Sequence, residues 1–195
     1  MADKQNETKV TLLARASFLA LFEAKAFGDD PNAKKEFSGS FLVQKSDTAQ
    51  LGKVKDAIMQ VAKARWGEKA PQVLSTLYRD DRLCLKDGDK KDYEGYAGNM
   101  YIRASNKVRP LVLNRDKTPL TEQDGVIYSG CYVEVIMSFW AQDNKWGKRV
   151  NANLRGVRFH SDGEAFSGGG TASVDEFGDE EGASPDVAGS DGFGF

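Results

Sequence analysis

The amino-acid sequence predicts a mainly β protein, an antiparallel barrel of five to six strands with one main α-helix and an acidic tail behind it. Three observations support this prediction. Several segments alternate apolar and polar residues with the two-residue period of a strand. One segment has the spacing of an amphipathic helix, and the chain carries no Lys or Arg after residue 160. We therefore expect one folded domain over residues 1–160 and a disordered tail over residues 161–195.

The first two strands are expected over residues 9–22 and 35–45, separated by a turn rich in Gly and Asp at residues 28–32. Every second residue of the first strand is apolar and is expected to face the core: Val10, Leu12, Ala14, Ala16 and Phe18. The corresponding positions of the second strand are Phe37, Gly39, Phe41 and Val43. Each strand therefore offers one face to a shared core.

The main helix is expected over residues 48–66. Asp47 can cap its start with Gln50 as the capping-box partner, and Gly67 can end it. Apolar residues recur within it at helical spacing: Leu51, Val54, Ile58, Val61 and Trp66. Its basic residues lie mainly off that stripe, which fits either a solvated face or a DNA-facing one. Residues 68–98 are polar and are expected to be mostly loop.

Strand patterns return after residue 98. Residues 100–105 and 109–113 predict short strands, and residues 130–141 predict the clearest one. Its apolar face consists of Cys131, Val133, Val135, Met137 and Phe139. A turn of Asn and Gly at residues 143–147 leads into a return strand that buries Val150, Ala152 and Leu154. Gly156 is expected to mark a β-bulge that shifts the register. This hairpin makes the sheet antiparallel and favours a small closed barrel.

The opposite faces of these strands, and the turn between them, combine aromatic rings with cations. Such a surface suits a single-stranded nucleic acid, because unstacked bases lie on the rings while Lys and Arg follow the phosphates. A small β barrel with this face binds in the manner of an OB-fold. The predicted contact residues are Tyr101, Arg103, Tyr132, Trp140, Lys145, Trp146, Lys148, Arg149 and Arg155. Cross-strand packing is the alternative role for Tyr132 and Trp140.

The net charge of -2 conceals two opposite parts. Residues 1–160 hold 27 basic and 20 acidic residues and carry +7, whereas residues 161–195 hold nine acidic residues, nine glycines and four phenylalanines. A basic body with an acidic tail indicates nucleic-acid contact by the body and protein contact by the tail. The tail is also long enough to reach the basic face of its own domain and compete there with DNA. Docking on a partner protein is predicted for Asp186, Asp191, Phe193 and Phe195.

The residue types that catalysis and metal binding require are scarce. The chain has one histidine, His160, and two cysteines, Cys84 and Cys131, without a Cys-x-x-Cys spacing. We therefore expect no metal site, no cofactor and no enzyme activity. No segment has the apolar length of a signal peptide or a membrane span, which predicts a cytosolic protein without membrane contact. The enzymatic alternative is a magnesium-dependent nuclease built on Asp80, Asp81, Asp87 and Asp89.

Taken together, the motifs resemble those of a family of bacteriophage single-stranded-DNA-binding proteins with a compact OB-fold. The resemblance is carried by residues 15–27, 37–45, 96–98, 109–110, 128–133 and 156–159. It implies an OB-fold that coats single strands during phage DNA replication, recombination and repair, in the cytoplasm of the infected bacterium. The Phe-ended acidic tail is similar to the tails of replication single-strand binders, which recruit polymerase, helicase or primase. A recombination mediator or strand-annealing protein is the alternative function, and either a monomer or a homodimer is compatible with the sequence.

Overall fold

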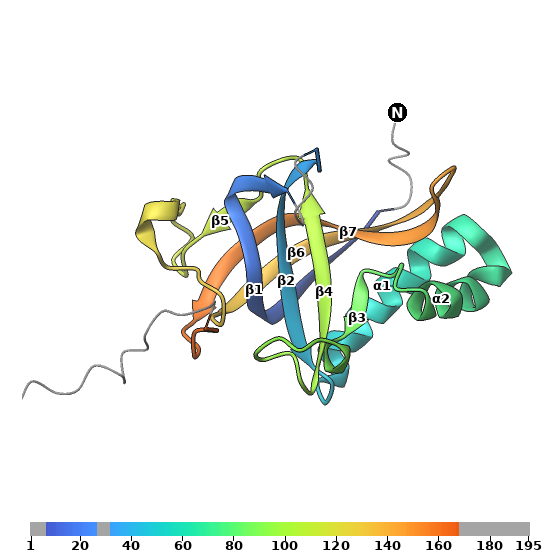
Figure 1. The fold of residues 1–195 in the computed structure, drawn as a ribbon, viewed down its shortest axis with the longest axis horizontal. Coiled ribbons are helices and arrows are strands. Elements are labelled where there is room, and N and C mark those ends of the chain that lie inside the picture. The colour runs from blue at the N-terminus through green and yellow to red at the C-terminus, as the bar shows by residue number, and fades with distance from the viewer. Residues whose placement is uncertain (1–6, 27–31, 168–195) are drawn as a thin grey trace, which may run out of the picture.

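A computed structural model of the 195-residue chain describes residues 7–26 and 32–167 (Figure 1). The strands are β1 (Thr8–Ala26), β2 (Lys35–Gln44), β3 (Leu85–Asp87), β4 (Asn99–Asn106), β5 (Leu111–Leu113), β6 (Tyr132–Asn144) and β7 (Gly147–Ser161). The helices are α1 (Thr48–Trp66) and α2 (Ala70–Arg79), with short 3-10 turns at Gly67–Lys69, Gly88–Lys90 and Glu122–Asp124. In this described part of the chain, neither α-helix is long and apolar enough to cross a membrane.

Five of the strands close into a barrel. The sheet order is β3-β4-β2-β1-β6-β7-β5, and an additional pairing of β4 with β7 joins its two halves. That closing pair is parallel and consists of Ser105 opposite Asn153, whereas β1–β2, β1–β6, β2–β4 and β6–β7 are all antiparallel. The predicted antiparallel barrel with one main helix is confirmed, and β3 and β5 extend the sheet beyond it.

The inward faces of β6 and β7 follow the predicted alternation. Every residue of the expected β6 core face, from Cys131 to Phe139, is completely buried. On β7 the register changes from Met137 opposite Leu154 to Ile136 opposite Gly156. Arg155 is therefore the extra residue of a bulge and points outward, and Val157 returns to the core. The predicted bulge at Gly156 is confirmed.

The first strand departs from the alternation at Phe18. The pairing of β1 with β2 shifts between Ser17 and Ala20, and Phe18 has a positive φ of 47°. This irregularity turns Phe18 outward, with 51% of its surface exposed, and lets Ala20 and Leu21 enter the core. The expectation that Phe18 faces the core is therefore wrong, because a bulge reverses the faces of a strand.

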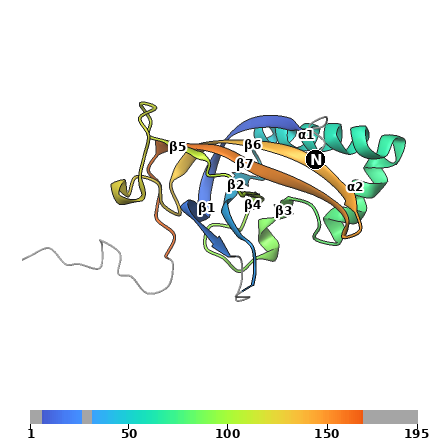
Figure 2. The same cartoon turned by 90° about the horizontal axis from the view of Figure 1, so that it is seen from above.

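Helix α1 begins and ends where the sequence predicts. The Asp47 side chain accepts a hydrogen bond from the backbone N–H of Gln50, and Gly67 ends the helix with a positive φ of 59°. The predicted capping box is wrong in its second half, because Gln50 Oε1 has no hydrogen-bond partner among the described residues and the backbone N–H of Asp47 donates to the Gln44 carbonyl instead. The apolar stripe from Leu51 to Val61 is buried, and α1 packs against β1 and β6. Figure 2 shows α1 and α2 together beside one end of the barrel.

Helix α2 lies in the region that was expected to be mostly loop. Pro71 stands in its first turn, where a missing backbone N–H does no harm. Its buried residues are Ala70 and Leu77, with Val73 and Leu74 packed partly against the core. The prediction missed α2 because such a short helix holds too few apolar positions to establish a period.

Candidate nucleic-acid interface

An open groove of about 690 Å³ lies on the outer face of β1, β2 and β4. Strands β2 and β4 form the floor of the groove. Phe41 of β2 pairs with Ile102 of β4, and both side chains point into the core and are completely buried. The residues next to them must point outward, so Ser40 stands opposite Arg103 on the outer face. Small side chains on this floor leave room above the sheet. The groove is lined mainly by Phe18, Ala20, Lys25, Ser38, Ser40, Asp81, Lys86, Lys91, Tyr93, Tyr96, Tyr101 and Arg103.

Four aromatic rings stand in sequence along this groove. Phe18 and Tyr93 meet edge to face with ring centroids 5.0 Å apart, and Tyr93 meets Tyr96 at 5.3 Å. Tyr96 then contacts Tyr101 at 5.0 Å. The inner pair is buried together with Leu42, and the Tyr96 hydroxyl donates to Ser17 Oγ. The outer pair is half exposed, Phe18 at 51% and Tyr93 at 50%, so each of these two rings offers free surface to a ligand.

Cations surround these rings. Lys25, Lys86, Lys91 and Arg103 all line the groove. Burial lowers the pKa of Arg103, but a guanidinium stays charged in proteins, and this one donates to Ser38 Oγ over 3.4 Å. Lys86 Nζ bonds the carboxylate of Asp81 at 2.6 Å, which neutralises the acidic residue of the groove. Burial also raises the pKa of Tyr101 to about 12, so its phenol is neutral at physiological pH.

The predicted residues of β4 lie in the groove, but with unequal exposure. Tyr101 retains only 6% of its surface, because Tyr96 and Leu42 cover it. Its ring supports Tyr96 rather than offering a face to a ligand. Arg103 lies on the outer face, as predicted, and lines the groove. Tyr132 lies elsewhere, on β6, with the guanidinium of Arg15 5.7 Å from its ring centre.

The remaining predicted residues lie on the β6–β7 hairpin, which extends past the barrel toward the helices (Figure 1). Trp146 at its tip is 72% exposed, as expected, and Lys145 Nζ lies 5.1 Å from its ring centre. Lys148 and Arg149 follow on the exposed start of β7. Closer to the barrel, Trp140 Nε1 donates to Asn153 Oδ1 at 3.1 Å, so Trp140 takes the cross-strand role. Arg155 is occupied by Ser138 Oγ and by an ion pair with Glu7.

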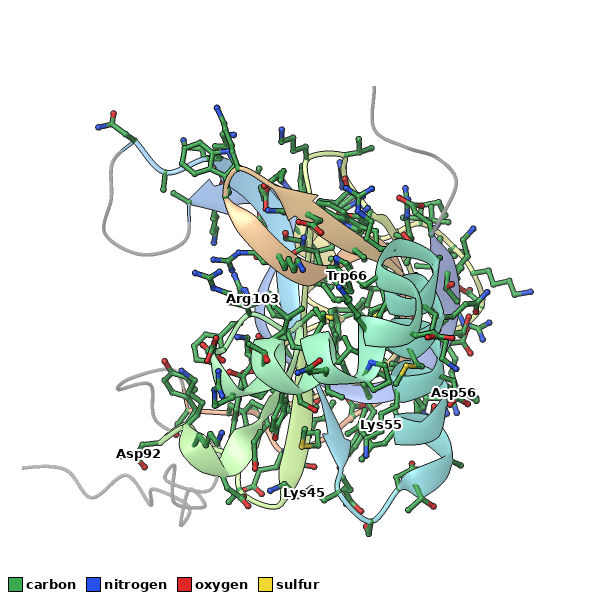
Figure 3. All side chains as sticks on the ribbon, turned by 90° about the vertical axis from the view of Figure 1, so that its right-hand side faces the viewer. Lys45, Lys55, Asp56, Trp66, Asp92 and Arg103 are labelled. Carbon is green, nitrogen blue, oxygen red and sulfur yellow. The ribbon has the colours of Figure 1, made fainter. Side chains whose placement is uncertain are left out.

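The hairpin is fixed to the end of α1. Trp66 Nε1 donates to the Asp143 carboxylate at 2.8 Å, and Arg65 donates to the Asp143 carbonyl at 3.0 Å. Figure 3 labels Trp66 on α1 and Arg103 on β4. The segment before β3 lies between the groove and the hairpin, and its Leu83 pairs with Val150 of β7. Arg82 in this segment approaches Gly147 closely enough that a Cβ there would lie 2.8 Å from its Nη1.

The aspartates of the nuclease alternative each face a protein cation. Lys45 Nζ lies 2.6 Å from Asp87 and 2.5 Å from Asp89, and these contacts hold the pKa of both carboxyls below the usual range. Asp80 pairs with Arg79, and Asp81 pairs with Lys86. In residues 7–26 and 32–167, no three His, Cys, Asp or Glu side chains gather as metal ligands.

Sequence reasoning missed six residues of the groove: Phe18, Lys25, Lys86, Lys91, Tyr93 and Tyr96. Phe18 had the period of a core residue, and the others belong to a strand end or to the region expected to be loop. The Tyr-x-x-Tyr spacing of Tyr93 and Tyr96 was the available signal. The predicted tail residues Asp186, Asp191, Phe193 and Phe195 lie outside the described residues.

The barrel has the strand order of an OB-fold, with β1, β2, β4, β6 and β7 as its first to fifth strands. OB-folds bind oligonucleotides and oligosaccharides on the face of their second and third strands and on the loops that join strands one to two and four to five. Here those strands are β2 and β4, which carry the groove, and the fourth connection is the hairpin tip with Trp146. The groove therefore occupies the ligand face of an OB-fold.

The chain belongs to the family of the Enterobacter phage Enc34 single-stranded-DNA-binding protein, whose profile matches residues 8–188. A protein designated p50, from Acyrthosiphon pisum secondary endosymbiont phage 1, is 47% identical over 167 residues, which cover 85% of this chain and 89% of that protein.

Solved structures resemble the fold as well. The Enc34 protein in complex with single-stranded DNA superimposes with a TM-score of 0.66 at 29% identity, over 84% of this chain and 91% of that one. The single-stranded-DNA-binding protein gp2.5 of bacteriophage T7 gives a TM-score of 0.54 at 12% identity, over 92% of this chain and all of the T7 chain. The second likeness is one of fold alone.

Proposed function

We propose that the protein binds single-stranded DNA in the aromatic groove, without sequence preference, catalysis or a cofactor. The observation that carries this proposal is the pair of half-exposed rings, Phe18 and Tyr93, on the ligand face of an OB-fold. Every base has a flat face, so stacking on rings tolerates any sequence. Membership of the Enc34 family and the likeness to a solved complex with single-stranded DNA support the choice of ligand.

Each part of the groove has a separate task in this proposal. Phe18 and Tyr93 stack on bases, and the buried Tyr96 and Tyr101 hold those rings in place. Lys25, Lys91 and Arg103 attract the phosphates, because cations along a groove follow the backbone of the strand. Lys86 contributes less, since Asp81 already neutralises it.

The strand continues from the groove to the hairpin tip. Arg82 lies beside Gly147 in the segment before β3, where Cys84 is hydrogen-bonded through its backbone to Val150 of β7 and to Arg103 of β4, so it forms a cationic step between the groove and the hairpin tip. Trp146, with Lys145, Lys148 and Arg149 around it, then offers a further ring and further phosphate contacts. We assign no base contact to three of the predicted residues, Trp140, Arg155 and Tyr132. The side chains of the first two form hydrogen bonds within the sheet, and Tyr132 lies away from the groove.

In the infected host cytoplasm, the protein coats single strands during phage DNA replication, recombination and repair. Its acidic tail recruits a replication protein such as a polymerase, helicase or primase, through Asp186, Asp191, Phe193 and Phe195. An acidic peptide with aromatic residues suits a basic-rimmed apolar pocket on such a partner. Binding of the full chain, and not of a variant with Phe193 and Phe195 replaced by Ala, to a purified polymerase, helicase or primase would support this role.

The test of the DNA site is the affinity for a labelled oligo-dT, measured by fluorescence anisotropy. Tyr93→Ala should weaken binding about 5- to 150-fold, the effect of losing one stacked base. Trp146→Ala should weaken binding to all sequences alike and abolish most of the tryptophan quenching. Lys55→Ala, on the exposed face of α1, is the control and should bind as the wild type does. Wild-type affinity of Tyr93→Ala would refute the groove as the site.

Two further assays separate this proposal from its alternatives. A gel shift on single-stranded, duplex and RNA oligomers defines the ligand class. Faster pairing of complementary strands in the presence of the protein would favour the strand-annealing function instead. Magnesium-dependent cleavage of a labelled single strand would contradict the absence of catalysis.

A further inference from the structure

The chain does not leave the body where β7 ends. Residues 162–167, which we call the tail root, lie along the surface of the barrel. The Tyr128 hydroxyl donates to the Asp162 carboxylate at 2.9 Å and accepts from the backbone N–H of Gly163 at 3.2 Å. Further along, the backbone N–H of Phe166 donates to the carbonyl of Ser129 at 3.0 Å. The first residues of the predicted tail are therefore part of the folded structure.

Arg15 of β1 holds the middle of the tail root. Its Nε donates to the Gly130 carbonyl at 2.9 Å, and its Nη2 donates to the Glu164 carbonyl at 2.6 Å. The same guanidinium lies 4.3 Å from the centre of the Phe166 ring, within the range of a cation–π contact. One side chain thus joins β1, the turn before β6 and the tail root.

Two glycines of the body leave space for this segment. A Cβ at Gly130 would lie 2.2 Å from the Glu164 carbonyl oxygen, and a Cβ at Gly95 would lie 2.3 Å from the Phe166 ring. Both glycines also have a positive φ, 110° at Gly130 and 78° at Gly95, which other residues rarely adopt. The surface is therefore closely fitted to the tail root at both points.

The far end of the tail root contacts the loop that carries Tyr93. Ser167 donates to the Glu94 carboxylate from its backbone N–H at 2.8 Å and from its hydroxyl at 2.6 Å. Phe166 packs on Gly95, the next residue. Tyr93 directly precedes this pair and keeps half of its surface exposed. Its position in the groove therefore depends on how well residues 94 and 95 are held.

We propose that the tail root is a strap that positions Tyr93 for base stacking, with Phe166 and Glu94 as its positioning residues. This inference rests on the proposed DNA site. A loop that is ordered before the ligand arrives loses less conformational freedom on binding, so the strap raises affinity without touching DNA. The tail sequence consequently has two parts with different effects on the groove, the anchored root, which supports it, and the acidic residues that follow in the sequence.

The direction in which Glu94→Ala changes DNA affinity separates a positioning role of Glu94 from a purely electrostatic one. Removing the negative charge of Glu94 beside the groove should by itself tighten DNA binding. If the strap positions Tyr93, Glu94→Ala should instead weaken binding about two- to tenfold, the effect of leaving one side chain to be ordered on binding. Glu94→Gln removes the same charge but keeps an oxygen that can accept from Ser167, so it should restore wild-type affinity or exceed it.

The experiment measures oligo-dT affinity of the full-length chain with Phe166→Ala, Glu94→Ala, Glu94→Gln and Tyr93→Ala, and with Phe166→Ala combined with Tyr93→Ala. Glu164→Gln is the matched control, because only the backbone carbonyl of Glu164 contacts Arg15. We expect Phe166→Ala to weaken binding about two- to tenfold in the wild-type background and to have no effect once Tyr93 is absent. Hydrogen exchange should become faster in residues 91–98 and stay unchanged in residues 133–139.

Each outcome decides the question. Wild-type affinity of both Phe166→Ala and Glu94→Ala, with a loss in Tyr93→Ala, overturns the strap and leaves the DNA site intact. An equal loss from Phe166→Ala with and without Tyr93 also overturns it, since the effect would not pass through that ring. Wild-type affinity of Tyr93→Ala overturns the groove and the strap together. If Phe166→Ala fails to fold, the comparison of Glu94→Ala with Glu94→Gln decides in its place.

Discussion

Replacing Phe18 by alanine and by glycine separates the contribution of its ring from the strain of its backbone. In residues 7–26 and 32–167, Phe18 is one of three non-glycine residues with a positive φ, together with Asp81 and Lys117. Asp tolerates this region through local hydrogen bonds, but a bulky apolar residue does not. Strained backbone of this kind tends to collect at functional sites. The ring that the strain turns outward is the one that stands beside Tyr93 in the groove.

The expected magnitudes follow from the geometry. An L-residue in the left-handed region costs about 1–2 kcal/mol, which glycine avoids. Glycine loses about 0.5–1 kcal/mol more chain entropy on folding than alanine. Phe18→Gly should therefore be about 0.5–1 kcal/mol more stable than Phe18→Ala, or about 1–4 °C in Tm. Both variants lack the ring, so both should lose the same stacking energy of about 1–3 kcal/mol, which corresponds to about 5- to 150-fold in oligo-dT affinity.

The assay combines thermal unfolding with fluorescence anisotropy on the two variants. Thr11, an exposed residue of β1 in regular pairing with β6, provides the matched control. There the glycine variant should be the less stable of the two and DNA affinity should not change. If the glycine variant is less stable than the alanine variant at position 18 as well, the backbone of Phe18 is not strained. If Phe18→Gly binds oligo-dT as tightly as the wild type, the Phe18 ring does not stack on a base.

Three other measurements address the charges. Lys91→Ala should reduce the steepness of the plot of log affinity against log salt by about 0.7, the value for one phosphate contact on a single strand. Lys55→Ala should leave the slope unchanged. If Lys91→Ala and the wild type have equal slopes, Lys91 does not contact a phosphate. Deleting residues 176–195 should tighten oligo-dT binding, most clearly at low salt, and an unchanged low-salt affinity would contradict competition by the tail. Lys45→Met should lower Tm near neutral pH. Because Lys45 depresses the pKa of Asp87 and Asp89 in the folded state, its stabilisation is present above the ordinary carboxyl pKa of about 4 and is lost as the pH falls through the depressed values; a difference from wild type that persists in acid would contradict this account.

Features that depend on neighbours along the chain could be predicted from the sequence. The β6 core face from Cys131 to Phe139, the Asp47 cap of α1 and the exposed Trp146 each follow from a local period or a turn, and all three are confirmed. The bulge at Gly156 was also predicted, because glycine inside a strand pattern signals such a site.

The groove could be predicted only in part, since it is assembled from distant segments. Tyr101 was correctly placed on the outer face of β4, but the loop that brings Tyr96 over it cannot be seen from strand alternation. Phe18 was assigned to the core, because the shift in pairing between β1 and β2 is a property of both strands together. The outward position of Arg103 could be predicted, since it depends only on the period of its own strand.

The barrel closes through a short junction between β4 and β7. In this junction the two strands pair only at Ser105 and Asn153. Two backbone hydrogen bonds reinforce it, from the N–H of Cys84 to the Val150 carbonyl and from the N–H of Arg103 to the Cys84 carbonyl. The groove lies on the β4 side of this junction and the hairpin tip on the β7 side. A DNA strand that runs from Tyr93 over Arg82 to Trp146 would contact both sides of the junction, so bound DNA would stabilise the closed barrel.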